Sequence, residues 1–202
     1  MSDSHYILIL YYSGTGHVAR MANEMAKGVE HQGLEARVRV VPKVSSTIEQ
    51  VEPKVPSKGP MYATVEDLAN CSGLLLGSPG YFGNMSSHLK FFLDGVSSVW
   101  LSGQLVNKPA GVFTSTASMH GGQESTLLSM MLPLFHLGMV MVGLPFTQAA
   151  LTKTERGGTP YGASHVTGEK GQWVDLSDEE RSLCFEQASR VADIAKRLNL
   201  QS

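Results

Sequence analysis

The chain has 202 residues, of which 42% are hydrophobic and 17% charged, with a formal net charge of −2 at pH 7. This length can bury one full core, so we expect a single domain over residues 1–202. The near-neutral charge offers no basic field for nucleic acid or for an anionic membrane surface. The start, Met-Ser-Asp-Ser, lacks the basic and apolar segments of a secretory signal, so we expect a cytoplasmic protein.

The first predicted strand, residues 6–10, runs into a loop of small residues that opens an amphipathic helix over residues 18–32. Loop N–H groups and the unpaired first-turn donors of the helix meet at the positive end of its macrodipole. A phosphate can therefore bind there without a lysine, and the hydroxyls of Ser13 and Thr15 would add donors.

Three kinds of phosphate loop compete for this pattern. A P-loop has four residues between its glycines and then Lys-Ser/Thr, whereas one residue separates Gly14 from Gly16 and the next lysine is Lys27. The dinucleotide fingerprint fits loosely through Ala19, but residues 39–42, at the end of the second strand, contain no acid for a ribose. We therefore favour a terminal monophosphate, such as that of FMN.

Strands and helices alternate along the rest of the chain. Short apolar runs predict strands at residues 34–41, 73–77 and 110–116. Between them lie a proline-rich surface loop at 42–60, a short helix capped by Thr64, and a helix over 85–99. The last of these helices directs four residues inward: Leu89, Phe92, Leu93 and Val96.

Residues 125–152 contain no charged side chain, and residues 127–146 are apolar enough to raise the possibility of a membrane helix. Four interruptions argue against it: Pro133, Gly138, Gly143 and Pro145. We expect a helix that ends near Leu137, with Gly138 as its stop, and a buried strand over 139–142. Either the domain or a second subunit must cover so apolar a helix.

Residues 143–175 form a glycine-rich extra segment before the last helix. That helix begins at a capping box, Ser177 with Glu180 three residues on. Its predicted core stripe is Cys184, Ala188, Val191, Ala195 and Leu198. The two cysteines, Cys71 and Cys184, lack metal-ligand spacing, so we expect buried, reduced thiols and no metal site.

Five strands separated by helices predict an α/β fold, a parallel sheet of order 2-1-3-4-5 with helices on both faces. A ligand then binds outside the carboxyl ends of the strands, at the switch between strands one and three. The loops that meet there are residues 13–17, 78–84 and 114–122. Gly80 and Gly83 would let backbone approach the edge of a flat ring, and Tyr81 and Phe82 can pack beside its faces.

Several motifs together resemble the tryptophan-repressor-binding-protein (WrbA) family of flavodoxin-like NAD(P)H:quinone oxidoreductases, from about His5 to the last helix. They are Tyr-Tyr-Ser before Gly16-His17, Gly77-x-Pro79-x-x-Phe82-Gly83-Asn84-Met85, Trp100-x-Ser102-Gly103, Gly121-Gly122-Gln123-Glu124, His136-x-Gly138-Met139, and Arg156-Gly157-Gly158-Thr159-Pro160-Tyr161-Gly162-Ala163. Departures occur at Gly14-Thr15, where the family often has a bulkier pair ending in tyrosine, and at Gly80-Tyr81, where it has a threonine-arginine type pair. The loss of that cation leaves the choice between NADH and NADPH open.

The resemblance implies FMN as the cofactor, held by two sets of residues. Its phosphate would be bound by Ser13, Gly14, Thr15, Gly16, His17 and Val18. Its ring and ribityl chain would be bound by Gly80, Tyr81, Phe82, Gly83, Asn84, Ser115, Thr116, Ala117, Ser118, Met119, His120 and His136. Trp100 would line the substrate pocket, and we expect Trp100 and His136 to be the catalytic residues. Family members are commonly homotetramers with sites at subunit contacts.

We therefore expect a two-electron, ping-pong reduction of quinones by NAD(P)H, with hydride passing through flavin N5. The alternatives are a flavodoxin-type one-electron carrier, which the weak charge disfavours, and a non-enzymatic partner-binding protein. Imidazoles near the ring can donate a proton to the quinone, which favours His120 and His136. The other histidines, His5, His31, His88 and His165, are expected at the surface or at strand edges, without a partner.

Overall fold

The computed structural model describes residues 5–45, 55–168 and 174–199. Its strands are β1 (Tyr6–Tyr11), β2 (Glu35–Val40), β3 (Gly73–Pro79), β4 (Pro109–Thr116), β5 (Val140–Met141) and β6 (Ser164–Val166). Its helices are α1 (His17–His31), α2 (Val65–Ala69), α3 (Ser87–Asp94), α4 (Ser97–Ser102), α5 (Gln123–His136), α6 (Ala149–Lys153) and α7 (Asp178–Asn199). Part of the predicted 42–60 loop lies outside the described residues.

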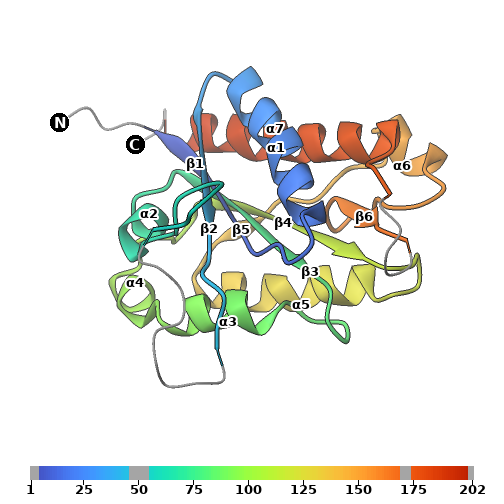
Figure 1. Ribbon diagram of the computed structural model, residues 1–202. Helices are drawn as coiled ribbons and strands as arrows, with labels where there is room; N and C mark the ends of the chain where they lie inside the picture. The colour runs from blue at the N-terminus through green and yellow to red at the C-terminus, as the bar shows by residue number, and fades with distance from the viewer. Residues whose placement is uncertain (1–4, 46–54, 169–173, 200–202) are drawn as a thin grey trace.

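The parallel sheet has the predicted order, β2-β1-β3-β4-β5, and adds a sixth strand. β5 pairs with the start of β4, where Pro109 lies opposite Val140, and β6 pairs with its end, where Thr114 lies opposite Ser164. The edge of the sheet is therefore built from two separate pieces (Figure 1). The extra segment after Gly143 supplies the second piece, which the five-strand prediction did not include.

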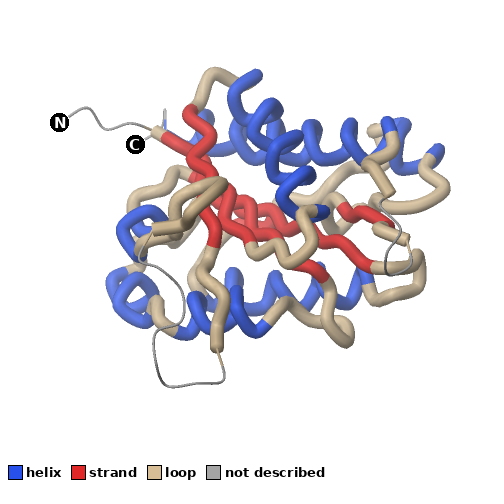
Figure 2. Tube along the Cα trace, in the orientation of Figure 1, coloured by secondary structure: helices blue, strands red, loops and turns tan. Residues whose placement is uncertain are grey.

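Helices cover both faces of the sheet, as predicted (Figure 2). Side chains of β1 alternate between the two layers because successive residues of a strand point to opposite faces. Leu8 and Leu10 belong to the core layer that includes residues of α2, α3, α4 and α5, whereas Ile7 and Ile9 belong to the layer that includes residues of α1 and α7. Every residue of β1 is buried, so this strand is the centre of the fold and holds the loop that follows it in place.

The prediction of a single helix over residues 85–99 is wrong, because α3 and α4 are separate helices. Ser86 is extended and caps α3, since its hydroxyl accepts the N–H of Leu89. Gly95 ends α3, and Val96 turns into the core before α4 begins. A glycine has poor helix propensity, and burial of Val96 stabilises the break.

Two other boundary predictions need correction. β5 covers only Val140–Met141 instead of a buried strand over 139–142, and Val140 is 46% exposed because it lies at the edge of the sheet. Leu198, predicted on the core stripe of the last helix, is 40% exposed, because it lies in the last turn of α7 beyond Ala195, which is buried.

The predicted helix signals are confirmed at three ends. Thr64 and Asp67 form a capping box for α2, and Ser177 and Glu180 form one for α7 through two backbone contacts. Gly138, with φ of 78°, follows the end of α5. Cys71 and Cys184 are free and buried, and burial raises the pKa of the Cys71 thiol to about 12.

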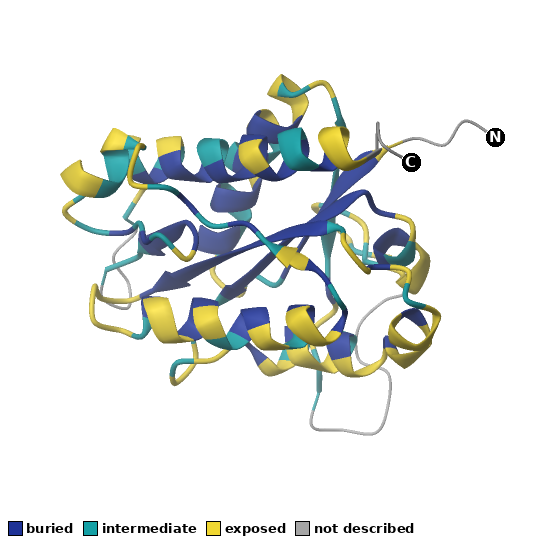
Figure 3. Cartoon of the chain, turned by 180° about the vertical axis from the view of Figure 1, so that it is seen from behind, coloured by how far each residue is buried: buried dark blue, intermediate teal, exposed yellow. Residues whose placement is uncertain are grey.

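One side of α5 is buried and the other faces outward (Figure 3). Leu127, Met130 and Leu134 pack against the sheet, but large apolar side chains remain exposed: Leu128, Leu132 and Phe135. Within the described residues, no helix is both long and apolar enough to cross a membrane. The domain itself therefore covers only half of this apolar helix.

Candidate functional site

Three loops lie together at the carboxyl edge of the sheet, after β1, β3 and β4 (Figure 1). The N–H of Gly80 donates to the carbonyl of Ser115 at 2.8 Å. A Cβ added at Gly80 would lie 2.9 Å from Cγ2 of Thr116, and one added at Gly122 would lie 3.3 Å from Cα of Gly83. The β3 and β4 loops are thus in direct contact, and their glycines are required for it.

The loop between β1 and α1 brings several hydrogen-bonding groups together at the start of a helix. Gly16 caps α1 with φ of 90°, a conformation that any side chain would strain. The hydroxyl oxygen of Ser13 accepts the N–H groups of Gly16 at 3.1 Å and of Ala19 at 3.3 Å. Gly14 and Thr15 are exposed beside it. Ser13 thus accepts two N–H groups at the start of α1, and with no acidic residue in its first turn the helix start favours a negatively charged group.

The next residue, His17, differs from the rest of the loop because its side chain is buried. Its Nδ1 lies 3.2 Å from Nε2 of His165, and Nδ1 of His165 lies 2.9 Å from Oε2 of Glu180. His165 is completely buried, so its prediction as a surface or strand-edge residue without a partner is wrong. His88 also has a partner, since its Nδ1 accepts the N–H of Val44.

Glu180 receives four further hydrogen bonds. Its Oε1 accepts the N–H groups of Gly157 and Val166, and its Oε2 accepts the N–H of Ser177 and a guanidinium N–H of Arg156. Burial alone would raise the pKa of Glu180, but the hydrogen bonds from His165 and the backbone hold it below its ordinary value. The carboxylate therefore stays ionised inside the protein.

The β3 loop presents two aromatic side chains to solvent. Tyr81 is 51% exposed and Phe82 is fully exposed. Reciprocal backbone hydrogen bonds between Tyr81 and Asn84 close a tight turn, in which Phe82 and Gly83 have φ of 52° and 75°. A phenylalanine in the left-handed backbone region costs free energy, and residues strained in this way are typical of ligand sites.

The β4 loop changes from buried to exposed along its length. Ser115 and Thr116 are buried, and the next four residues are exposed: Ala117, Ser118, Met119 and His120. Below the loop, at the start of α5, two buried polar atoms have no hydrogen-bond partner within the described part of the chain, Nε2 of Gln123 and Oγ1 of Thr126. Oγ1 of Thr126 lies 3.0 Å from the Cβ position of Gly80.

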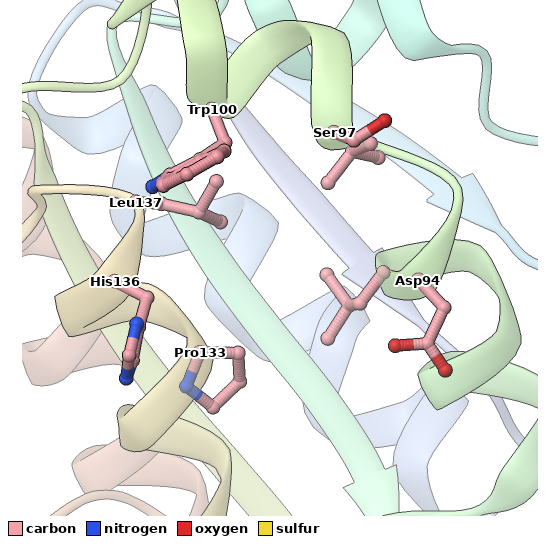
Figure 4. A pocket seen from close by; sticks show the side chains of 8 residues that line it. Asp94, Ser97, Trp100, Pro133, His136 and Leu137 are labelled. Atoms are coloured by element: carbon pink, nitrogen blue, oxygen red, sulfur yellow. The ribbon is translucent and has the colours of Figure 1, made fainter.

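Trp100 and His136 lie elsewhere, in a cleft of about 400 Å³ between α4 and the end of α5 (Figure 4). Apolar side chains form much of its wall: Leu93, Val96, Pro133 and Leu137. The cleft is near the amino ends of the strands, since Asn107, just before β4, donates its N–H to the carbonyl of Gly138. A helix of 14 residues is about 20 Å long, so α5 separates His136 from the loops by about that distance.

The structure thus brings the predicted residues together in two groups. The residues predicted for the phosphate and the ring, other than His136, lie at the carboxyl edge. Trp100 and His136 share the cleft between α4 and the end of α5, and these elements lie at the opposite edge (Figure 1). Sequence reasoning did not predict that His165 and Glu180 connect to His17 in the β1 loop. The only sequence pattern that involved either residue was the predicted capping box at Glu180. Within the described residues, no cluster of three or more histidine, cysteine or acidic side chains is arranged to hold a metal.

An open parallel α/β sheet of this order, with a loop that opens a helix after β1 and two more loops at the same edge, defines a flavodoxin-like protein. The chain belongs to the family of NADPH-dependent FMN reductases, whose model matches residues 10–152. It is 43% identical over 201 residues to an NAD(P)H dehydrogenase (quinone) of Geobacter sulfurreducens, with 96% of this chain and 98% of that relative covered.

Further relatives agree with this assignment. An NAD(P)H dehydrogenase (quinone) of Solidesulfovibrio magneticus is 40% identical over 203 residues, covering 95% of this chain and 98% of the relative. The crystal structure of a WrbA-like flavodoxin from Agrobacterium tumefaciens has the same fold, with a TM-score of 0.65 and 22% identity over 96% of this chain and 99% of that one. The resemblance inferred from the motifs is confirmed.

Proposed function

We propose that this protein is an FMN-dependent NAD(P)H:quinone oxidoreductase of the cytoplasm. The relatives named NAD(P)H dehydrogenase (quinone) cover nearly the whole chain. The observation that supports the cofactor is the β1 loop. The Ser13 hydroxyl accepts the N–H groups of Gly16 and Ala19, and its own O–H, together with the other N–H groups at the start of α1, would donate to a terminal phosphate. The buried thiols Cys71 and Cys184, both unpaired, fit a reducing compartment.

When bound, FMN supplies a ring atom, N5, that takes hydride from a nicotinamide and passes it to a quinone. Residues of this chain bind and orient it. Backbone N–H groups in the exposed part of the β4 loop would face the ring edge, where they would stabilise negative charge. The exposed rings of Tyr81 and Phe82 would pack beside the ring system. One open face then serves NAD(P)H and quinone in turn, which is a ping-pong cycle.

Trp100 and His136 act, in this proposal, on the flavin of a second subunit of a homotetramer. Neither can reach the loops of its own chain across the length of α5. Both lie on the outward side of the layer formed by α3, α4 and α5, whose exposed apolar residues are Phe91, Leu101, Leu128, Leu132 and Phe135. If another subunit covers this surface with its carboxyl-edge loops, Trp100 would lie against the quinone ring and His136 within reach of its oxygens.

Anaerobic mixing distinguishes the enzyme from a one-electron carrier. NADH or NADPH should bleach the FMN-loaded protein directly to the two-electron reduced state, and benzoquinone should restore its absorbance. The net charge of −2 gives little of the field that steers carrier partners. A lasting one-electron radical in the EPR spectrum would favour the carrier, and no bleaching at all would favour a non-enzymatic binding protein.

A complementation experiment tests whether the two groups of residues act between subunits. Gly16→Val should abolish FMN binding, because φ at this position is 90°, and Trp100→Ala should keep FMN but lose quinone turnover. Exchange of subunits between the two inactive variants creates sites with flavin from one chain and Trp100 from the other, so activity should partly return. A protein that stays inactive after verified exchange, or is monomeric by light scattering, refutes the shared site.

Binding measurements test the phosphate site separately. FMN should bind more tightly than riboflavin, which lacks the phosphate, and than FAD, whose phosphate is not terminal. Equal affinities for all three flavins would contradict the assignment of the β1 loop. The result is independent of turnover, so it separates the cofactor proposal from the quinone proposal.

A further inference from the structure

Three buried ionisable side chains connect the β1 loop to the start of α7. His17 opens α1, His165 lies in the middle of β6, and Glu180 lies in the first turn of α7. Their two contacts, 3.2 Å between the imidazoles and 2.9 Å to the carboxylate, form one continuous path. His165 also lies opposite Ser115 in the sheet, beside the β4 loop. We refer to His17, His165 and Glu180 as the His–His–Glu chain.

The hydrogen-bond pattern limits how many protons this chain can hold. Glu180 accepts five hydrogen bonds and stays ionised, so Nδ1 of His165 carries the proton that faces it. The contact between His17 and His165 holds a single proton, because two N–H groups cannot point at each other across 3.2 Å. With both rings neutral, His17 donates from Nδ1 and its Nε2 carries no proton.

Only one more proton fits. It produces an imidazolium on either His17 or His165, and in both arrangements Nε2 of His17 becomes an N–H. A second added proton would place two N–H groups face to face at the same contact. The His–His–Glu chain is therefore a one-proton site that ends in the phosphate loop.

The surroundings disfavour that proton until an anion arrives. His17 lies at the positive end of the α1 macrodipole, with Arg20 one turn further on. Arg156 approaches Glu180 from the segment after α6. Asp175 is paired with Arg20 and with Arg181 of α7. Burial, together with His165 and Arg20, lowers the pKa of His17.

We propose that the His–His–Glu chain takes up one proton when the FMN phosphate binds at the start of α1, with His165 and Glu180 as positioning residues for His17. The inference rests on the proposed FMN function. A phosphate dianion offsets the positive helix end and favours an imidazolium beside it. FMN affinity then rises as pH falls through the pKa of the phosphate-bound chain, by at most about tenfold per pH unit. It levels off below the pKa of the free chain.

Calorimetry at pH 7, in two buffers of different ionisation enthalpy, counts the protons taken up per bound flavin. The wild-type protein should take up more protons with FMN than with riboflavin, by up to one. His165→Asn keeps an amide for Glu180 but removes the nitrogen that faces His17, so it should abolish this difference. His31→Asn, at the far end of α1, is the matched control and should behave as the wild type does. Protonation of the FMN phosphate itself is common to all variants.

Equal proton uptake by the wild type and His165→Asn would overturn the proposal. His17→Asn provides a second test if His165→Asn does not fold, since it removes the ring at the other end of the same contact and should also lose the uptake. FMN binding to the wild type without extra uptake overturns this inference alone. Absence of FMN binding overturns the proposed cofactor as well, so the two failures are distinguishable.

Discussion

Glu180→Gln tests how strongly one buried carboxylate stabilises the fold around the site. Oε1 of Glu180 accepts two backbone N–H groups, from Gly157 and Val166, and Oε2 accepts three donors. Glutamine keeps one oxygen. The better placement leaves it at the three-donor position and turns the amide NH₂ toward the two backbone donors. Each buried donor without a partner costs about 1–3 kcal/mol, so we expect the unfolding free energy to fall by about 2–6 kcal/mol.

Urea unfolding at pH 7 measures this loss, with the slope of the transition compared between variants. Glu186→Gln is the control on the same helix, since it disturbs one part-buried contact with Gln148 and should cost less than about 1 kcal/mol. The pKa of Glu180 is lowered in the fold, so its stabilisation is complete above the unfolded pKa of about 4.3 and is lost as pH falls through the folded pKa. Equal stability of Glu180→Gln and Glu186→Gln at pH 7 would refute the reasoning.

Three further predictions concern the loop, the extra segment and the thiols. Ser13→Ala should raise the FMN dissociation constant about ten- to a hundredfold, since a hydrogen bond to a charged group contributes about 1.5–3 kcal/mol; flavin fluorescence measures it, and an unchanged constant contradicts the assignment. Gly162→Ala should lower the unfolding free energy by about 1–3 kcal/mol, because its Cβ would lie 2.1 Å from a carbonyl oxygen of β4; an unshifted urea midpoint would rule this out. Cys71 and Cys184 should resist a thiol reagent until urea unfolds the protein, because burial raises both pKa values; rapid labelling of the native protein would show that they are accessible.

The parts of the fold that sequence reasoning predicted are those encoded locally. The run of β1, the loop and α1 is contiguous, and strand order places the other two loops beside it. β6 was not predicted, because three residues are too few to show a strand pattern. In addition, its pairing partner β4 lies far from it in the sequence. His165 was misplaced for the same reason. His165 is buried by α7 and α1, and the residues next to it in the sequence do not indicate that these helices pack there.

Trp100 and His136 show a different limit of sequence reasoning. Motifs name residues that serve one site, but they do not say whether one chain can assemble it. About 20 Å of α5 lies between His136 and the loops of the same chain, which no side chain can span. The same helix leaves Leu132 and Phe135 exposed, and an apolar surface of this kind requires a cover. The proposed second subunit would cover this surface and also bring Trp100 and His136 to a flavin, so one proposal accounts for both the uncharged sequence of α5 and the separation of the two groups of residues.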